Sequence, residues 1–141
     1  YNKFADSITV SETEWDFERY KPDIIVINLG TNDMNYATTD ERKAEFEDGY
    51  LDFLKKVRSL NPDSYIFQTY GVMGTSLEEN IENVRRKYMS ETGDERITFI
   101  PLTMQDEDAD GIVADWHPSP RTHSLVSQKV TAAIKKTLGY K

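Results

Sequence analysis

The fold is decided by the stretch DIIVINL at residues 23–29, which ends at Gly30. Its apolar, largely β-branched residues follow one another without polar alternation, which is typical of a strand covered on both faces, as in a parallel sheet. Two further short segments, at 64–70 and 97–100, have strand character, and longer segments of helical period separate the three. This order predicts an α/β protein whose parallel strands are connected by helices.

Helices are predicted at about 40–60, 76–92 and 120–138, with a short one near 12–20 in a polar lead-in. Apolar residues at three- and four-residue spacing mark the buried face of the first two long helices. The local start and stop signals are Thr38 or Thr39, the capping-box sequence SLEE at 76–79, Gly93, Ser119 before Pro120, and Gly139.

Three strands are few for this architecture, since a typical sheet has about five or six. We therefore expect residues 1–141 to form the C-terminal part of one doubly wound α/β domain, with strands missing upstream.

Composition excludes several classes of function. The chain has 141 residues, 17 Lys and Arg, 25 Asp and Glu, a net charge of −8 and no cysteine. The acidic balance argues against nucleic acid or an anionic membrane as the main partner. The absence of cysteine excludes disulfides, thiolate zinc sites and a cysteine nucleophile. The longest strictly apolar run, at 24–27, is far too short for a membrane span, and no signal peptide is visible.

Polar residues gather in the loops expected at the carboxyl edge of the sheet, where ligands of open parallel sheets bind. These loops contain GTND at 30–33, GVMG at 71–74 and DWHPS at 115–119. An asparagine carboxamide can donate to a developing oxyanion, and a histidine can move protons at neutral pH. This edge therefore gathers groups that can donate hydrogen bonds and move protons.

The stretch VINLGTND at 26–33 resembles the third conserved block of the SGNH (GDSL-like) hydrolases, and DWHPS at 115–119 resembles their last block. The pair is most similar to carbohydrate esterase family 2, whose members are secreted acetyl esterases acting on acetylated xylan and related plant polysaccharides. The resemblance covers about residues 12–138. It implies a three-layer α/β/α, flavodoxin-like fold, an extracellular location, a polysaccharide substrate and no cofactor.

By this resemblance, Asn32 supplies an oxyanion-hole donor and Gly30 permits the turn that places it. His117 is the general base that activates a serine and then protonates the leaving sugar hydroxyl. The positions of Val72, Met73 and Trp116 leave three alternatives open: Trp116 forms a sugar platform, Trp116 lines an acyl pocket with Val72 and Met73, or these residues are ordinary packing at the sheet edge. His123 is expected to be a helix or surface residue.

The sequence departs from the superfamily pattern beside the histidine. The last block usually carries Asp three residues before His, and that position is Ala114 here. A carboxylate in a triad orients the imidazole and stabilises its charged form. Two alternatives remain open for this role, namely Asp115 and a backbone carbonyl.

The nucleophile block is also missing. ADSIT at 5–9 imitates Gly-Asp-Ser, but no apolar strand precedes Ser7 and only 25 residues separate Ser7 from Asn32. We therefore expect the serine to lie outside the chain, the chain alone to be inactive, and its exposed sheet edge to favour a homodimer. The alternatives are a complete small esterase using Ser7 and a non-catalytic module that binds calcium or carbohydrate.

The calcium alternative depends on an acidic loop. Asp106, Asp108 and Asp110 followed by Gly111 match the first half of an EF-hand loop. The twelfth position, where a bidentate Glu belongs, is His117, and a strand precedes the loop in place of a helix. The pattern favours a solvated acidic loop, and no metal site is predicted.

Overall fold

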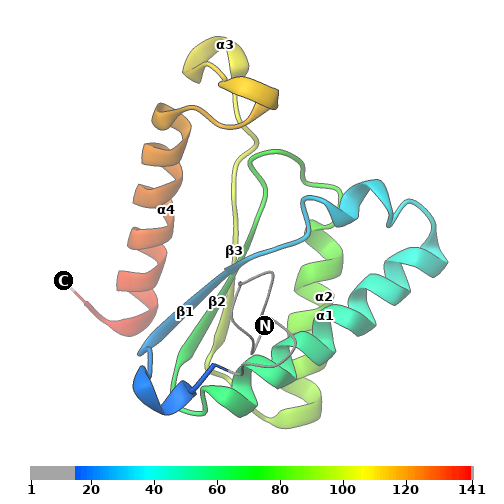
Figure 1. Cartoon of the computed structure of the whole chain (residues 1–141), viewed down its shortest axis with the longest axis vertical. Helices are drawn as coiled ribbons and strands as arrows, with labels where there is room; N and C mark the ends of the chain where they lie inside the picture. Colours follow the sequence, from blue (N-terminus) through cyan, green and yellow to red (C-terminus); the bar gives the residue numbers. More distant parts are fainter. Residues whose placement is uncertain (1–14, 141) are drawn as a thin grey trace.

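A computed structural model describes residues 15–140, and its centre is a three-stranded parallel sheet (Figure 1). The strands are β1 (Ile24–Asn28), β2 (Tyr65–Tyr70) and β3 (Ile97–Pro101), in the spatial order β1-β2-β3. The register places Gln68 of β2 between Ile27 of β1 and Phe99 of β3. The predicted α/β class and parallel sheet are confirmed.

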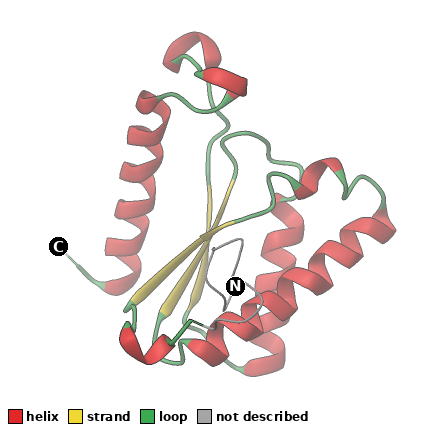
Figure 2. Ribbon diagram, in the orientation of Figure 1, coloured by secondary structure: helices red, strands yellow, loops and turns green. Residues whose placement is uncertain are grey.

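Helices cover both faces of the sheet, so the fold has three layers (Figure 2). Helices α1 (Asp40–Leu60) and α2 (Glu78–Thr92) lie on one side, and α4 (Pro120–Leu138) lies on the other. The alternation of side chains along each strand explains this division, because successive residues face opposite layers. Ile66 packs towards α1 and α2, whereas the adjacent Phe67 packs towards α4.

The core is larger on the side of α1 and α2. Leu54 and Val57 of α1 and Ile81 of α2 are fully buried there against Ile66. Burying one such aliphatic side chain contributes about 1.5–3 kcal/mol. On the opposite face, the apolar stripe of α4 packs on Phe67 and Ile100, but its members stay partly exposed.

Most of the predicted helix ends are confirmed. Thr39 accepts a hydrogen bond from the Arg42 N–H at the start of α1, and Ser119 accepts one from the Thr122 N–H at the start of α4. Gly93 and Gly139 adopt left-handed conformations after α2 and α4. These caps satisfy backbone groups that a helix end otherwise leaves without partners.

Three local predictions need correction. The SLEE sequence does not form a capping box, because the fully buried Leu77 occupies the cap position and the Glu78 N–H bonds to the Thr75 carbonyl. The loop at 101–118 contains the short helices α3 (Glu107–Asp110), capped by Asp106, and η3 (Ala114–Trp116). The lead-in helix is a single 3-10 turn, η1 (Phe17–Arg19), and residues 12–14 of its predicted span lie outside the described residues.

The outer edge of β1 has no strand partner within residues 15–140. Val26 of β1 and Leu29, which directly follows β1, are 49% and 47% exposed, and such exposure is high for apolar residues at a parallel strand. The described part of the chain contains no helix that is both long and apolar enough to span a membrane.

Arg58 forms hydrogen bonds with the loops that precede β2 and β3, at the amino end of the sheet. Its guanidinium contacts the Asp94 carboxylate at 2.6 Å and the Ser64 carbonyl at 2.6 Å, and it also bonds to the carbonyl of Arg96. Burial opposes ionisation of Asp94, but the Arg96 N–H, the Tyr88 hydroxyl and Arg58 together hold the pKa of its carboxyl below its usual value. This network lies opposite the carboxyl edge and stabilises the fold.

Candidate active site

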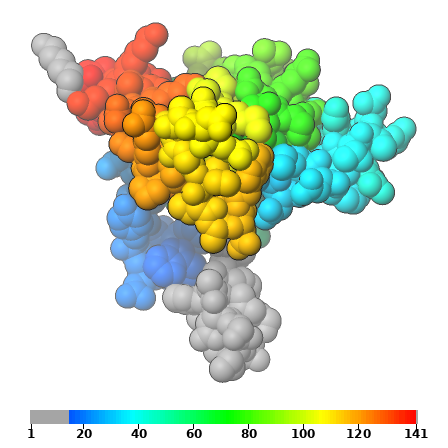
Figure 3. Space-filling view, turned by 90° about the horizontal axis from the view of Figure 1, so that it is seen from above, coloured from blue at the N-terminus to red at the C-terminus, as the bar shows by residue number. Residues whose placement is uncertain are grey.

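The predicted site residues follow the carboxyl ends of the strands, which parallel pairing places at one edge of the sheet. Asn32 follows β1, and His117 lies in the loop after β3. Seen from above in Figure 3, the loop after β3 (yellow to orange) covers the centre of this face. The segment after β1 (cyan) lies on one side of it and α4 on the other.

The turn after β1 presents Asn32. Gly30 has a φ of +116°, and a Cβ there would lie 3.2 Å from the Tyr70 ring, so glycine suits both the conformation and the packing. The turn closes through a hydrogen bond from the Met34 N–H to the Gly30 carbonyl, 3.1 Å. Asn32 is exposed and does not cap the short helix η2 (Asp33–Asn35) that follows it. Its carboxamide is therefore available to a ligand.

The turn after β2 joins the other two loops. Gly71 has a φ of +136°, and a Cβ there would lie 2.5 Å from the Leu102 carbonyl oxygen. At Gly74, a Cβ would lie 2.5 Å from the Met34 sulfur, so this turn also contacts η2. Val72 has a φ of 65° and is buried against Ile100 and Leu102. The three strand-end loops thus pack as one unit.

The histidine loop is closed on itself and on α4. An isolated antiparallel bridge pairs Ile112 with Pro118, and the Val113 N–H donates to the His117 carbonyl at 2.9 Å. The Ser119 hydroxyl donates to the Asp110 carbonyl at 2.6 Å, and Asp110 also forms an ion pair with Arg121. These contacts fix the acidic segment to the start of α4.

The backbone beside the histidine is strained. Asp115 and Trp116 have φ values of 56° and 62°, in the left-handed region that bulky side chains disfavour. Such conformations cost on the order of 1–3 kcal/mol per residue and cluster at functional sites. The turn therefore needs surrounding contacts to persist.

The His117 ring is exposed, and its Nδ1 lies 3.1 Å from the Ala114 carbonyl oxygen. A carbonyl oxygen can only accept a hydrogen bond, so in the neutral ring this contact places the proton on Nδ1 and leaves the lone pair on Nε2. Of the two orienting groups that the sequence leaves open, the backbone carbonyl is in contact with the ring. Asp115 is exposed, and within residues 15–140 it forms no ion pair with His117. In the Nδ1–H tautomer, Nε2 is able to accept a proton.

The remaining predicted residues are placed as follows. Trp116 is 41% exposed beside His117, whereas Val72 belongs to the core and only Met73 is partly accessible. His123 is exposed on α4. Ser7 lies outside the described residues. Asp106 caps α3, and residues 15–140 contain no cluster of three or more metal-ligating side chains.

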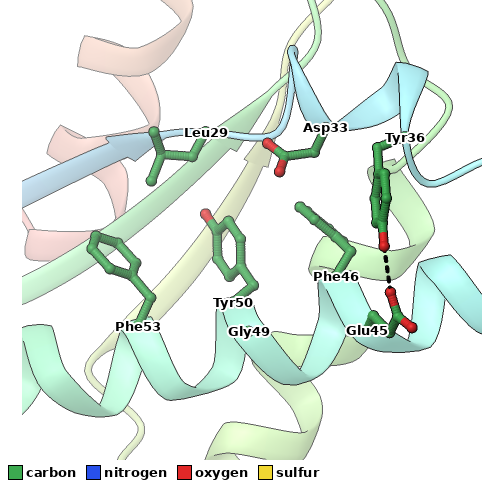
Figure 4. Close-up of a pocket in the computed structure, with 8 residues that line it drawn as sticks. All are labelled: Leu29, Asp33, Tyr36, Glu45, Phe46, Gly49, Tyr50 and Phe53. Carbon is green, nitrogen blue, oxygen red and sulfur yellow. Dashed lines mark hydrogen bonds between the residues drawn. The ribbon is translucent and has the colours of Figure 1, made fainter.

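A cavity of about 360 Å³ lies beside the asparagine turn, between the segment that follows β1 and helix α1 (Figure 4). Phe46, Tyr50 and Phe53 form a row along one side, and Asp33 and Leu29 face them. Burial raises the pKa of Tyr50 to about 12, and a hydrogen bond with the side chain of Gln68 opposes this shift. The helical spacing of these rings identified a buried stripe but gave no sign of a cavity.

Two elements of the site have no motif in the sequence. The first is the Ala114 carbonyl, because every residue has a backbone carbonyl and no residue type marks this one. The second is Gln105, whose Nε2 donates to the Trp116 carbonyl at 2.9 Å. A single glutamine before an acidic segment carries no chemical signal by itself.

Comparison with known proteins identifies relatives over nearly the whole chain. Residues 6–125 match the model of the GDSL-like lipase/acylhydrolase family. The cellulase/esterase CelE of Acetivibrio thermocellus is 35% identical over 148 aligned residues, which span 99% of this chain and 17% of that protein.

Solved structures of carbohydrate esterases also resemble this chain. A family two carbohydrate esterase from Clostridium thermocellum, in complex with cellohexaose, superimposes with a TM-score of 0.84 at 34% identity over 99% of this chain. An acetyl xylan esterase from Butyrivibrio proteoclasticus superimposes with a TM-score of 0.84 at 27% identity over 93% of this chain. The chain spans 43% and 40% of these two structures.

Proposed function

Because the chain belongs to the GDSL-like lipase/acylhydrolase family, we propose that it supplies the general base and one oxyanion-hole donor of a carbohydrate O-acetylesterase. The observation that carries the proposal is the state of His117. Its ring is exposed at the carboxyl edge of the sheet, and Nδ1 donates to the Ala114 carbonyl, so Nε2 is available to accept a proton.

In the proposed reaction, His117 Nε2 removes the proton from a serine hydroxyl as the serine oxygen attacks the acetyl carbonyl. The Asn32 carboxamide donates to the resulting oxyanion, and Gly30 keeps that side chain at the turn. His117 then returns the proton to the sugar oxygen, which leaves. Water, activated by His117 in the same way, hydrolyses the acetyl-serine.

The serine is proposed to come from outside these residues. Ser119 is two residues from His117, but its hydroxyl donates to the Asp110 carbonyl and its oxygen caps α4. This assignment agrees with the share of the solved relatives that the chain spans, about two-fifths. The chain is accordingly proposed to act as part of a longer catalytic domain and to be inactive alone.

The proposed substrate is an acetyl ester on a plant polysaccharide such as xylan. Trp116 supports this, because a half-exposed indole beside the base offers a flat surface for a sugar ring. Relatives named as an acetyl xylan esterase and as an esterase bound to cellohexaose add to the support. Such a substrate would place the protein outside the cell.

A homodimer through the free edge of β1 is the proposed state of the isolated chain. Val26 and Leu29 are about half exposed at an edge whose backbone groups can pair with another strand. Native mass spectrometry should give twice the mass of one chain, and a monomer that binds no apolar dye would contradict this proposal.

The experiment that tests the function uses a longer polypeptide carrying these residues and compares His117→Ala with His123→Ala. Release of acetate from acetylated xylan should fall by about 10³-fold or more for His117→Ala. It should stay near wild type for His123→Ala, because that ring is exposed on α4. Equal activities of the two variants would refute the assignment and favour a non-catalytic carbohydrate-binding role.

The two orienting groups are separated by Asp115→Asn. If the Ala114 carbonyl orients the ring, this variant should keep its rate within about tenfold of wild type. A loss near 10⁴-fold, the size seen when a triad carboxylate is replaced, would assign that role to Asp115.

A further inference from the structure

Gln105 connects the strained histidine turn to the sheet. Its backbone N–H donates to the Val72 carbonyl at 2.8 Å, which fastens it to the turn after β2. Its side chain, in a residue only 8% exposed, donates from Nε2 to the Trp116 carbonyl at 2.9 Å. Gln105 therefore links the turn that follows the central strand to the residue immediately before His117.

The position of this bond matters because of the backbone it holds. Asp115 and Trp116 both have backbone conformations with positive φ. A return of either residue to a negative φ would rotate the peptide groups that link Ala114 to His117. The Ala114 carbonyl accepts from the His117 N–H at 3.3 Å and contacts the ring Nδ1 at 3.1 Å. A contact that restrains the Trp116 carbonyl thus restrains the group that orients the imidazole.

We propose that Gln105 is a positioning residue. Its amide holds the turn at 114–117, so that the His117 ring keeps its Nδ1–H tautomer and its orientation. This inference rests on the proposed esterase function for its catalytic consequence, but the geometric part does not require turnover. Gln105 touches neither substrate nor the reacting atoms in this account. It acts through Trp116 and Ala114.

The chemistry required at this position is narrow. Only a donor can bond to the Trp116 carbonyl, which rules out aliphatic residues and an ionised carboxylate. The site is buried, so a donor that carries a full charge would be costly there. A glutamine amide meets both conditions, although its Oε1 is left buried without a partner.

The test uses ¹⁵N NMR of the imidazoles in the 141-residue chain, at a pH where both histidines are neutral. Wild-type His117 should be mainly the Nδ1–H tautomer. Gln105→Glu, which keeps the shape and removes the donor, should lose that preference. His123 is the reference within the same spectrum. Gln128→Glu is the matched control, because Gln128 also donates from its amide but is exposed on α4.

A buried carboxylate can unfold a loop by itself, so Gln105→Met is measured in parallel. It should show the same change at His117 while the amide spectrum of the sheet stays native. A wild-type tautomer for His117 in both Gln105 variants would overturn the proposal. So would a change that appears equally at His123, because it would report general loss of structure.

In the longer polypeptide, kcat should fall by about 10- to 100-fold for Gln105→Met, with less change in KM, as expected for a misplaced base. Unchanged kcat with an altered tautomer would overturn the catalytic consequence. Absence of hydrolysis in every protein, wild type included, would count against the proposed function alone, because the tautomer measurement still decides the role of Gln105.

Discussion

Replacing Gly71 by alanine should destabilise the protein at the point where the three site loops meet. Gly71 directly follows β2 and has a φ of +136°. An added Cβ would lie 2.5 Å from the Leu102 carbonyl oxygen and 2.8 Å from the Leu102 Cβ. The first of these atoms belongs to the backbone and the second is attached directly to it, so rotation of a flexible side chain cannot relieve the contact.

The size of the effect follows from two costs. Holding a non-glycine residue in this region of φ lowers the free energy of unfolding by on the order of 1–3 kcal/mol. Forcing an extra methyl group into a packed site costs about 1–3 kcal/mol more. The sum is about 4 kcal/mol, a large share of the 5–15 kcal/mol that typically separates folded from unfolded domains.

Gly49→Ala provides the matched control. Gly49 lies within α1, and a Cβ there would meet no atom within 4 Å. Alanine should therefore raise the free energy of unfolding by about 0.5–1 kcal/mol, the usual difference between these residues in a helix. The same chemical change thus has opposite signs at the two positions.

Urea unfolding followed by circular dichroism measures both values, provided that the slopes with denaturant agree among the three proteins. Our reasoning would be refuted if Gly71→Ala lay within about 0.5 kcal/mol of wild type, or if both variants shifted stability in the same direction.

Four further predictions concern the two ends of the sheet. Arg58→Ala should cost about 3 kcal/mol in urea unfolding, because the side chains of Arg58 and Asp94 are only 14% and 15% exposed. Folding holds the pKa of Asp94 below its ordinary 3.8, so the stabilisation that Asp94 contributes should persist above that pH. It should be lost on acidification through the lower pKa of the folded state, and acid titration should find a smaller loss in Arg58→Ala than in wild type. At the site, Asn32→Ala should lower kcat by about 10²–10³-fold in the acetate-release assay, whereas Asn35→Ala, three residues along the same turn, should not. Trp116→Ala should weaken retention on an oligosaccharide affinity gel, and unchanged retention would remove its proposed role as a sugar platform.

The sequence predicts the sheet well because the relevant forces are local and repeated. The β-branched run of β1 and the helical spacing of α1 each carry several residues of consistent signal. The caps at Ser119, Gly93 and Gly139 depend on a few neighbouring backbone atoms, and they were predicted correctly. The capping box at Ser76 failed because burial of Leu77 and a backbone turn from Thr75 decide that end of α2.

The site was only partly predictable. Motif and topology together placed Asn32 and His117 at one edge of the sheet, and the structure agrees. The contacts that hold them depend on backbone carbonyls of Ala114 and Trp116 and on close approach at Gly71. Such contacts depend on the three-dimensional path of the loop, which residue identity does not encode locally. The cavity beside Tyr50 is equally invisible, because an aromatic stripe looks the same whether or not it is fully covered.

The most direct test of the central claim is labelling with a fluorophosphonate, read by peptide mass spectrometry. This reagent forms a covalent adduct with a serine that a histidine base activates. No adduct should form on the 141-residue chain. In the longer polypeptide, one adduct should form on a serine supplied from outside these residues, and it should be lost in His117→Ala. An adduct on Ser7 of the 141-residue chain would contradict the account and make the chain a complete serine hydrolase, and absence of labelling in both proteins would contradict catalysis by His117.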